Sequence, residues 1–381
     1  MCPGDPRDAW AGGRRGSPPA ADPWRAGPTI RNQVIRPRQA IASMQPYEWE
    51  PPSARIAQNA GVPEEDVIRF DTNTAPWPGA ALADLPSLTL NEYPDTSYAT
   101  LTDALHAYTG VAANWITVGA GADEILDLLA KGFIGSGDPV VLSRPTYAMF
   151  RIVSEIAGGR VIAVPTVGLQ LDLDPFLRAA REARLTWLCN PNNPTGELQA
   201  LPMVERVLAA TDGIVAVDEA YFEFSGVTAA ALIPRFENLV IVRTLSKAFG
   251  LAGVRVGYAL AGPAISDTLR RVRPPGSISV VSEALAVRAL SDQPGMRRRV
   301  AQIIEARQAL RDDLSRIGLE VLSSAGNFLL VRAGRDVSSM LLRRGLVVRS
   351  FPAGSPVDGY IRITVRTPEA NARLVQALRD R

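Results

Sequence analysis

The middle of the chain alternates short apolar runs with stretches of helical spacing. Runs of strand length occupy residues 116–118, 140–142, 161–164, 185–189, 214–217 and 239–242. Strands that alternate with helices favour a mostly parallel sheet, because the connecting helices cover both of its faces. We therefore expect an α/β fold for this part of the chain.

Polar residues follow these runs repeatedly, at the points where the expected strands end. They are Asn193, Asp218, Tyr221, Ser246 and Lys247. In parallel sheets, ligands bind beyond the carboxyl ends of the strands. The pattern predicts a functional site at that edge of the sheet.

Lys247 stands out because lysine is rare in this chain. Only Lys131 and Lys247 are lysines among 41 basic residues. A guanidinium stays protonated, whereas a lysine amine can lose its proton and attack a carbonyl. Lys131 lies beside a glycine near an expected helix end, and we interpret it as a surface residue. The rarity of lysine does not by itself distinguish a nucleophilic Lys247 from a chance surface lysine. The neighbouring motifs are needed to choose between the two.

A glycine-rich turn at residues 119–123 leads into an expected helix at 124–130. The free N–H groups at a helix N-terminus suit a phosphate. Many turns between a strand and a helix are rich in glycine, so this turn is a weak signal by itself. It also lacks the third glycine of the dinucleotide-binding fingerprint.

Composition excludes several classes of function. The net charge is +2, so nothing indicates a nucleic acid or a membrane surface as partner, and no apolar run has the length of a membrane-spanning helix. His106 is the only histidine and lies in an expected helix, so we expect neither a His-based triad nor a metal site. The two cysteines, Cys2 and Cys189, do not suggest a disulfide framework and fit a cytoplasmic protein.

The two ends of the chain differ from its middle. Residues 1–43 are rich in Pro, Gly and Arg and are predicted to be a disordered leader, with Met44 as an alternative start. From residue 264 onward, helices at 267–273, 297–316 and 368–378 accompany short apolar runs, which predicts a second, α+β domain.

The predicted site offers an amine, a carboxylate, a phenol and a phosphate cradle, without metal or histidine. Pyridoxal phosphate (PLP) requires this set of groups. Its aldehyde needs a lysine, its ring nitrogen needs a carboxylate, and its phosphate needs a helix N-terminus with hydroxyls and an arginine. Taken alone, Asp218 could instead cap a turn, and Tyr147 could belong to the core.

Three motifs closely resemble those of the fold-type I aminotransferases, which are PLP enzymes, and especially the histidinol-phosphate aminotransferase branch. They are NPNNPTG at 190–196, VDEAY at 217–221 and TLSKAFGLAGVRVGY at 244–258. The resemblance extends from residue 44 to the C-terminus. It implies a seven-stranded sheet in a large PLP-binding domain at 73–263, a small domain at 264–381 joined by residues 44–72, and a homodimer with shared active sites.

The resemblance also implies roles for the cofactor-site residues. Lys247 holds PLP as a Schiff base and moves the proton at the substrate Cα, and Asp218 pairs with the ring nitrogen. The other implied contacts are Tyr221 and Asn193 to the phenolic oxygen, Tyr147 to the ring face, Ala122, Asp123, Ser246 and Arg255 to the phosphate, and Tyr93 to the phosphate of the neighbouring subunit.

On the substrate side, the resemblance implies that Arg362 binds the α-carboxylate, supported by Asn73. Tyr47 and Arg349 match residues that bind the substrate's distal phosphate, although Arg349 could also be a charge at the rim. Two places depart from the family pattern. Residues 73–78, which include Trp77, replace a NENPYG-like loop, and Arg366 stands where glycine is usual.

The expected activity is reversible amino transfer between an amino donor and 2-oxoglutarate or glutamate, with L-histidinol phosphate as the specific choice of donor. Two alternatives stay open. One is PLP-dependent decarboxylation of a phosphorylated amino acid, as in threonine-phosphate decarboxylases. The other is transamination of an aromatic or specialised amino acid.

Overall fold

The computed structural model describes residue 41, residues 51–77 and residues 88–381. The expectations for Tyr47 and for almost all of the leader at 1–43 lie outside the described residues.

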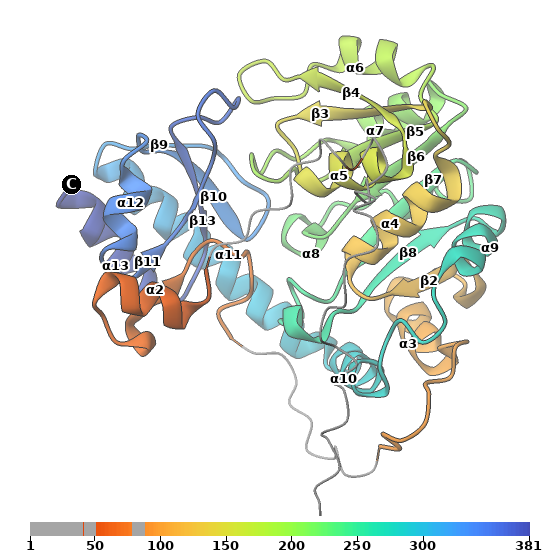
Figure 1. Cartoon of the computed structure of the whole chain (residues 1–381), viewed down its shortest axis with the longest axis horizontal. Helices are drawn as coiled ribbons and strands as arrows, with labels where there is room; N and C mark the ends of the chain where they lie inside the picture. Colours follow the sequence, from red (N-terminus) through yellow and green to blue (C-terminus); the bar gives the residue numbers. More distant parts are fainter. Residues whose placement is uncertain (1–40, 42–50, 78–87) are drawn as a thin grey trace, which may run out of the picture.

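A large sheet forms the centre of the molecule (Figure 1). In the described part of the chain it has seven strands, in the order β2-β8-β7-β6-β5-β3-β4. They are β2 (Ile116–Gly119), β3 (Pro139–Arg144), β4 (Arg160–Pro165), β5 (Leu185–Cys189), β6 (Ile214–Asp218), β7 (Leu239–Thr244) and β8 (Gly257–Ala261). All neighbours from β7 to β4 are parallel, and β8 is antiparallel to both β7 and β2. The predicted α/β fold with a mostly parallel seven-stranded sheet is confirmed.

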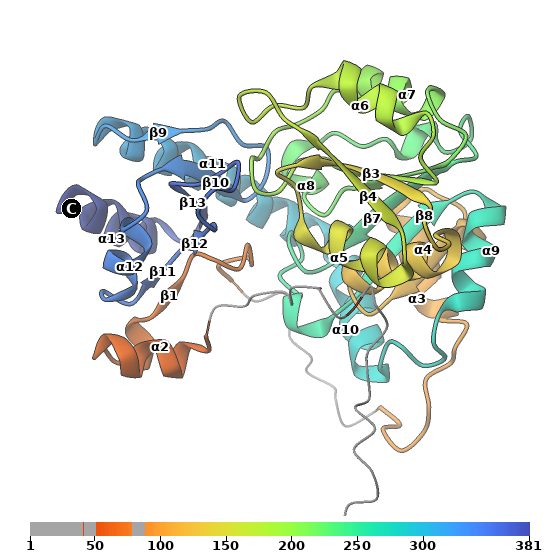
Figure 2. The ribbon, with the colours of Figure 1, turned by 45° about the horizontal axis from the view of Figure 1, so that its top comes forward.

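Each face of this sheet is buried under helices, because successive side chains of a strand point to opposite faces. In β7, Leu239 and Ile241 belong to one apolar cluster, whereas Val240 and Val242 belong to the other. The first face is covered by α3 (Ala99–Thr109), α6 (Leu173–Ala180) and α7 (Leu201–Ala209), and the second by α4 (Ala122–Phe133), α5 (Ala148–Ala157) and α9 (Pro263–Val272). Figure 2 shows α6 and α7 on one side of the strands and α4 and α5 on the other.

A smaller unit lies beside the large sheet (Figure 1). Its antiparallel sheet has the order β12-β13-β10-β9. Its strands and helices are β9 (Glu320–Val321), β10 (Phe328–Arg332), β12 (Arg349–Ser350), β13 (Tyr360–Thr364), α11 (Gln293–Arg316), α12 (Val337–Leu342) and α13 (Pro368–Arg379). The N-terminal strand β1 (Ile68–Arg69) pairs in parallel with β11 (Leu346–Val347). The apolar run at 346–349 does not form one continuous strand, because the chain breaks at Val348 and serves two different sheets.

Several further elements connect these units. They are α2 (Ser53–Ala60), α8 (Phe222–Ser225), α10 (Val280–Ser291) and the short 3₁₀ helices η1 (Glu64–Asp66), η3 (Ala113–Trp115), η4 (Ala230–Leu232) and η5 (Ala252–Val254). The domain boundary at residue 264 stays a prediction; α9, which begins at Pro263, packs against α4, β2 and β8 of the large unit. Among the described residues, no helix is both long and apolar enough to cross a membrane.

Candidate active site

A cavity of about 420 Å³ lies where the large sheet meets the small unit. Cys189, Asp218 and Thr244, the last residues of β5, β6 and β7, line it. The predicted site residues that line it are Asn73, Ala122, Asp123, Tyr147, Asn193, Asp218, Tyr221, Ser246, Lys247, Arg255, Arg349 and Arg362. The structure therefore brings together residues that lie far apart in the chain, at the strand ends where a ligand is expected.

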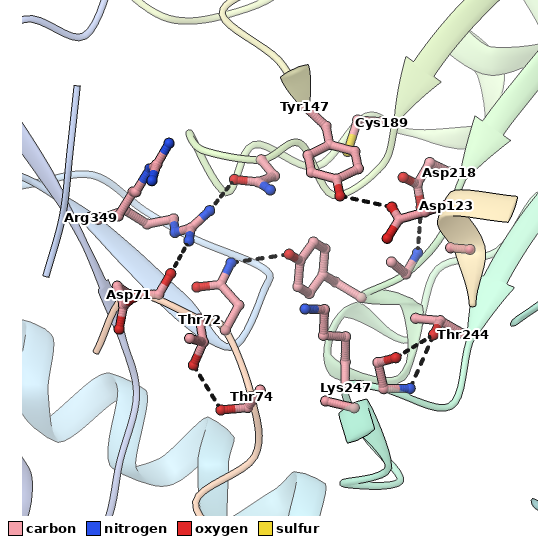
Figure 3. A pocket seen from close by; sticks show the side chains of 18 of the residues that line it. Asp71, Thr72, Thr74, Asp123, Tyr147, Cys189, Asp218, Thr244, Lys247 and Arg349 are labelled. Atoms are coloured by element: carbon pink, nitrogen blue, oxygen red, sulfur yellow. Dashed lines mark hydrogen bonds between the residues drawn. The ribbon is translucent and has the colours of Figure 1, made fainter. Parts of the chain in front are cut away.

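Lys247 follows the end of β7, after a turn that two hydroxyl groups hold in place. Ser246 N donates to Thr244 Oγ1 at 3.1 Å, and Thr244 Oγ1 donates to Ser246 Oγ at 2.9 Å. The Lys247 side chain extends into the cavity (Figure 3). Burial, together with the nearby charge of Arg362, lowers the pKa of Lys247 to about 8. A substantial fraction of the amine is therefore neutral near neutral pH, and this is the nucleophilic form.

Asp218 ends β6 and is buried. Its Oδ1 accepts a hydrogen bond from Ala220 N at 3.0 Å. Burial raises the pKa of Asp218 to about 7, because the charged carboxylate is poorly solvated there. A cation placed in the cavity beside it reverses this effect and stabilises the ionised form.

Tyr221 lies three residues after Asp218 and presents its hydroxyl to Asn73. Asn73 Nδ2 donates to the Tyr221 hydroxyl at 3.0 Å. Burial raises the pKa of Tyr221, so the phenol is protonated at neutral pH and can donate a hydrogen bond. Asn73 has a left-handed backbone, with φ of 50°, and Thr364 Oγ1 donates to its Oδ1 at 3.0 Å.

The N-terminus of α4 and Arg255 form one end of the cavity. Arg255 Nη2 donates to Asp123 Oδ2 at 3.0 Å, and the Tyr147 hydroxyl donates to Asp123 Oδ1 at 2.9 Å. Gly121 precedes the helix with φ of 82°, and a Cβ at this position would lie 2.5 Å from Arg255 Nη2. The free backbone N–H groups of Ala122 and Asp123, the helix dipole and the guanidinium make this end suitable for an anion.

Two arginines from the small unit form the opposite side of the cavity. Arg349 of β12 pairs directly with Arg362 of β13 in the antiparallel ladder, so both side chains lie on one face. Arg362 Nη1 donates to Asn193 Oδ1 at 2.7 Å, and its Nη2 donates to the carbonyl oxygen of Asp71. In Figure 3, Arg349 and Asp71 lie across the cavity from Asp218. The paired guanidinium groups suit a substrate that carries anionic groups.

A buried ion pair joins the strands that carry Asp218 and Lys247. Arg243 of β7 donates from Nε and Nη2 to Glu219 Oε2 at 3.0 and 2.9 Å. Ala229 N donates to the other oxygen of Glu219 at 2.6 Å. The satisfied pair fixes the end of β6 relative to the end of β7.

Among the described site residues that the sequence predicts, Tyr93 does not line the cavity and is 96% exposed in the single chain. Tyr47 lies outside the described residues, so its predicted place is not tested. The structure also adds lining residues to which the sequence assigned no role. They are Asp71, Thr72, Thr74, Cys189, Ala220, Thr244 and Ala252. Cys189 and Thr244 are the last residues of their strands, so the rule that ligands bind beyond the carboxyl ends of parallel strands would have indicated them.

Comparison with known proteins places this geometry in a family. The sequence profile described as "Aminotransferase class I and II" matches residues 68–378. The chain belongs to the class I and II aminotransferases. Among the relatives of this aminotransferase, a histidinol-phosphate aminotransferase of Caldanaerobacter subterraneus subsp. tengcongensis is 40% identical over 77% of this chain and 85% of its own length. That of Symbiobacterium thermophilum is 36% identical over 90% of this chain and 97% of its own length.

A solved structure shows the same fold as this aminotransferase. The histidinol-phosphate aminotransferase of Sinorhizobium meliloti, in complex with pyridoxal-5'-phosphate, has a TM-score of 0.83 and 27% identity, and the match covers 92% of this chain and 98% of that one. The family prediction made from the three motifs is thus confirmed. Within the described residues of this aminotransferase, no group of three or more His, Cys, Asp and Glu side chains could hold a metal ion.

Proposed function

We propose that this aminotransferase binds PLP through Lys247 and moves an amino group between L-histidinol phosphate and 2-oxoglutarate or glutamate. The observation that carries the proposal is that a single cavity is lined by Lys247 and by Arg349 and Arg362, which are partners in the ladder of β12 and β13. The substrates named for the relatives are phosphorylated, and guanidinium groups bind phosphate and carboxylate in the same bidentate manner.

The residues present fit PLP on chemical grounds. When bound, PLP supplies an aldehyde and an electron-withdrawing ring that stabilises negative charge at the substrate Cα. Lys247 would hold the aldehyde carbon, and Asp218, buried with a raised pKa, would gain a cationic partner in the ring nitrogen. The phosphate would lie at the N-terminus of α4, within reach of Ser246 and Arg255.

The chain's own groups account for the proton transfers. Lys247, with a pKa near 8, can accept and return the proton at the substrate Cα, because general bases work best near the ambient pH. When PLP is bound, Asp218 would hold the proton on the ring nitrogen. Tyr221 and Asn193 would bind the phenolic oxygen, and Asn193 also accepts a hydrogen bond from Arg362. Tyr147, at the start of α5, would lie against the ring.

The small unit binds the anionic groups of the substrates. Arg362 binds the α-carboxylate of glutamate, and Asn73 holds the neighbouring segment. Arg349 binds the phosphate of histidinol phosphate, and Tyr47 completes that subsite. The role proposed for Tyr47 is taken from the family resemblance alone. The role proposed for Arg349 is also supported by its pairing with Arg362 in the strand ladder.

The proposed active unit is a homodimer. Tyr93 is almost fully exposed in the single chain, together with Leu90 on the same loop. A tyrosine this exposed has lost no solvation and is free to reach the PLP phosphate of a second subunit. We place the enzyme in the cytoplasm, which agrees with the free, buried thiol of Cys189.

Half-reactions of the PLP-loaded enzyme test the function. The enzyme is mixed in turn with histidinol phosphate, phenylalanine, glutamate and threonine phosphate. Loss of the PLP absorbance with formation of pyridoxamine phosphate reports amino transfer, and CO₂ release reports decarboxylation. We expect pyridoxamine formation with glutamate and, at the highest kcat/KM, with histidinol phosphate. A preference for phenylalanine, or CO₂ release from threonine phosphate, would establish one of the two alternative activities instead.

A further inference from the structure

Alternate residues at the end of β13 hold one segment of the N-terminal part of the chain. Arg362, Thr364 and Arg366 are spaced by two, and all three contact the segment of residues 69–75. Side chains at this spacing share one face of a strand. Arg362 and Thr364 bind Asp71 and Asn73, which belong to the cavity wall. Arg366 lies beyond the strand and outside the cavity lining.

Arg366 makes the most extensive of these contacts. Its guanidinium donates to the carbonyl oxygen of Arg69 through both Nε and Nη2. It also donates to the carbonyl oxygens of Thr74 at 3.2 Å and Ala75 at 3.3 Å, and to the hydroxyls of Thr72 at 3.3 Å and Thr74 at 3.1 Å. These acceptors lie before and after Asn73 in the chain, so the Arg366 side chain holds the backbone on both sides of that residue.

The backbone of Arg366 is itself held in place. Its N–H donates to Asn371 Oδ1 at 3.0 Å, and Asn371 Nδ2 donates to its carbonyl oxygen at 2.9 Å. Asn371 belongs to α13, so the guanidinium extends from a fixed point in the small unit. Burial lowers the pKa of Arg366 to about 10, which leaves it charged at neutral pH.

The segment needs such support because Asn73 has an unfavourable backbone. A left-handed φ of 50° is uncommon for residues other than glycine and persists only where the surroundings impose it. In this conformation Asn73 reaches Tyr221, and the carbonyl of Asp71 reaches Arg362. Relaxation of the segment would withdraw both contacts from the cavity.

We propose that Arg366 is a positioning residue for the amino donor: it holds residues 69–75 in the conformation that places Asn73 and Arg362 for substrate binding. This inference rests on the proposed function, which assigns Arg362 and Asn73 to the binding of the substrate. Arg366 and the 73–78 loop are also the two places where the sequence differs from the motifs of the family that it resembles, and the structure shows them in contact through Thr74 and Ala75. The arginine supplies hydrogen-bond donors to carbonyl oxygens of this loop.

Steady-state and half-reaction kinetics of Arg366→Met test the proposal in the PLP-loaded enzyme. We expect KM for the amino donor to rise roughly tenfold while kcat changes less than about threefold, since the lost contacts act on substrate binding. Arg366→Lys keeps the charge but lacks the planar fork and should restore only part of the KM. Arg379→Met, which removes an exposed arginine of α13, is the control and should leave both constants unchanged.

Hydrogen exchange of the 67–77 peptide separates this proposal from the proposed function. We expect faster exchange in Arg366→Met than in the wild type or in Arg379→Met, with the PLP absorbance unchanged. This result does not depend on which donor is used. If the wild type rejects histidinol phosphate, the proposed function fails, and KM is then measured with the best donor of the panel.

Thr74→Val provides a second route if Arg366→Met does not fold. It removes one hydroxyl acceptor of Arg366 and should raise KM in the same direction by a smaller factor. In a double variant that carries both Thr74→Val and Arg366→Lys, the free-energy changes calculated from KM should sum to less than the two single changes. The reason is that both substitutions act on the same contact. Unchanged exchange at 67–77, a KM within about twofold of the wild type, or full additivity would overturn the proposal.

Discussion

Asn73 donates a hydrogen bond of 3.0 Å to the hydroxyl of Tyr221, across 148 residues of sequence. Tyr221 belongs to the loop after β6, whereas Asn73 is held by Thr364 of the small unit. This single bond therefore connects the side of the cavity proposed to bind PLP with the side proposed to bind substrate. Movement of either side alters the other through it.

Replacement of Lys247 with alanine should abolish PLP attachment. The variant keeps the cavity but lacks the amine, so we expect no visible absorbance band after PLP is added and a loss of kcat of more than about a thousandfold. Absorption spectra and a transamination assay measure both effects. Lys131→Ala is the control, because Lys131 is exposed and pairs with Asp127. A variant at Lys247 that stays coloured would contradict the assignment.

The raised pKa of Asp218 predicts a pH-dependent stability of the apoenzyme. The folded-state pKa is about 7, against an ordinary value of about 4 in the unfolded chain. The group therefore stabilises the apoenzyme below pH 4 and loses this contribution as the pH rises through about 7. As the pH rises through this range, the unfolding free energy of the wild-type apoenzyme should therefore fall relative to that of Asp218→Asn.

Urea unfolding of both proteins at several pH values measures this difference. PLP should remove it from the wild type, because the ring nitrogen pairs with the carboxylate. A difference between the two apoenzymes that does not change with pH would refute the raised pKa.

Arg349 should distinguish phosphorylated from unphosphorylated donors. A hydrogen bond to a charged group contributes about 1.5–3 kcal/mol, so Arg349→Met should raise KM for histidinol phosphate roughly tenfold or more. KM for glutamate should change little, because Arg362 remains. Arg332→Met, an exposed arginine of the same sheet, is the matched control. Equal effects on both donors would argue that Arg349 is only a charge at the rim.

Subunit hybrids should reveal the role of Tyr93. Tyr93→Phe should weaken PLP binding by roughly tenfold or less, as expected for one lost hydrogen bond. A hybrid dimer joins one Tyr93→Phe subunit with one Lys247→Ala subunit, so only the first subunit can hold PLP. If Tyr93 serves the neighbouring subunit, that site has both natural residues and should have wild-type affinity. If it serves its own subunit, that site should keep the weakened affinity.

The buried pair of Arg243 and Glu219 should be important for stability. Arg243→Met leaves the carboxylate buried without its partner, which costs about 3–5 kcal/mol of unfolding free energy. The exposed pair of Arg235 and Glu205 provides the control, and Arg235→Met should cost less than about 1 kcal/mol. Urea denaturation measures both. Similar losses for the two variants would mean that burial of the first pair has little energetic effect.

The strand ends were predictable from sequence because their pattern is local. Asp218 directly follows an apolar run, Ser246 lies a few residues after the next one, and the topology of a parallel sheet brings such positions together. Asp71 lies in the cavity wall, where its carbonyl oxygen accepts from Arg362 of β13, 291 residues away, and no local pattern reports such a contact. The sequence likewise marked Arg366 as unusual, but only the fold shows which atoms it binds.

The break at Val348 was also beyond local prediction. The run at 346–349 is apolar enough for one strand, but its two halves pair with β1 and β13, which lie far apart in the chain. Partners of this kind are set by tertiary packing and not by the propensity of the run itself.

The cavity draws its two walls from two different units of the chain. Asp218 and Lys247 belong to the unit of the large sheet, whereas Arg349 and Arg362 belong to the small sheet. Under the proposed function, mutations on the small sheet can change which amines are accepted while the chemical machinery on the large sheet is inherited intact. Such an arrangement would let a gene duplicate acquire a new substrate through changes confined to one unit of the molecule.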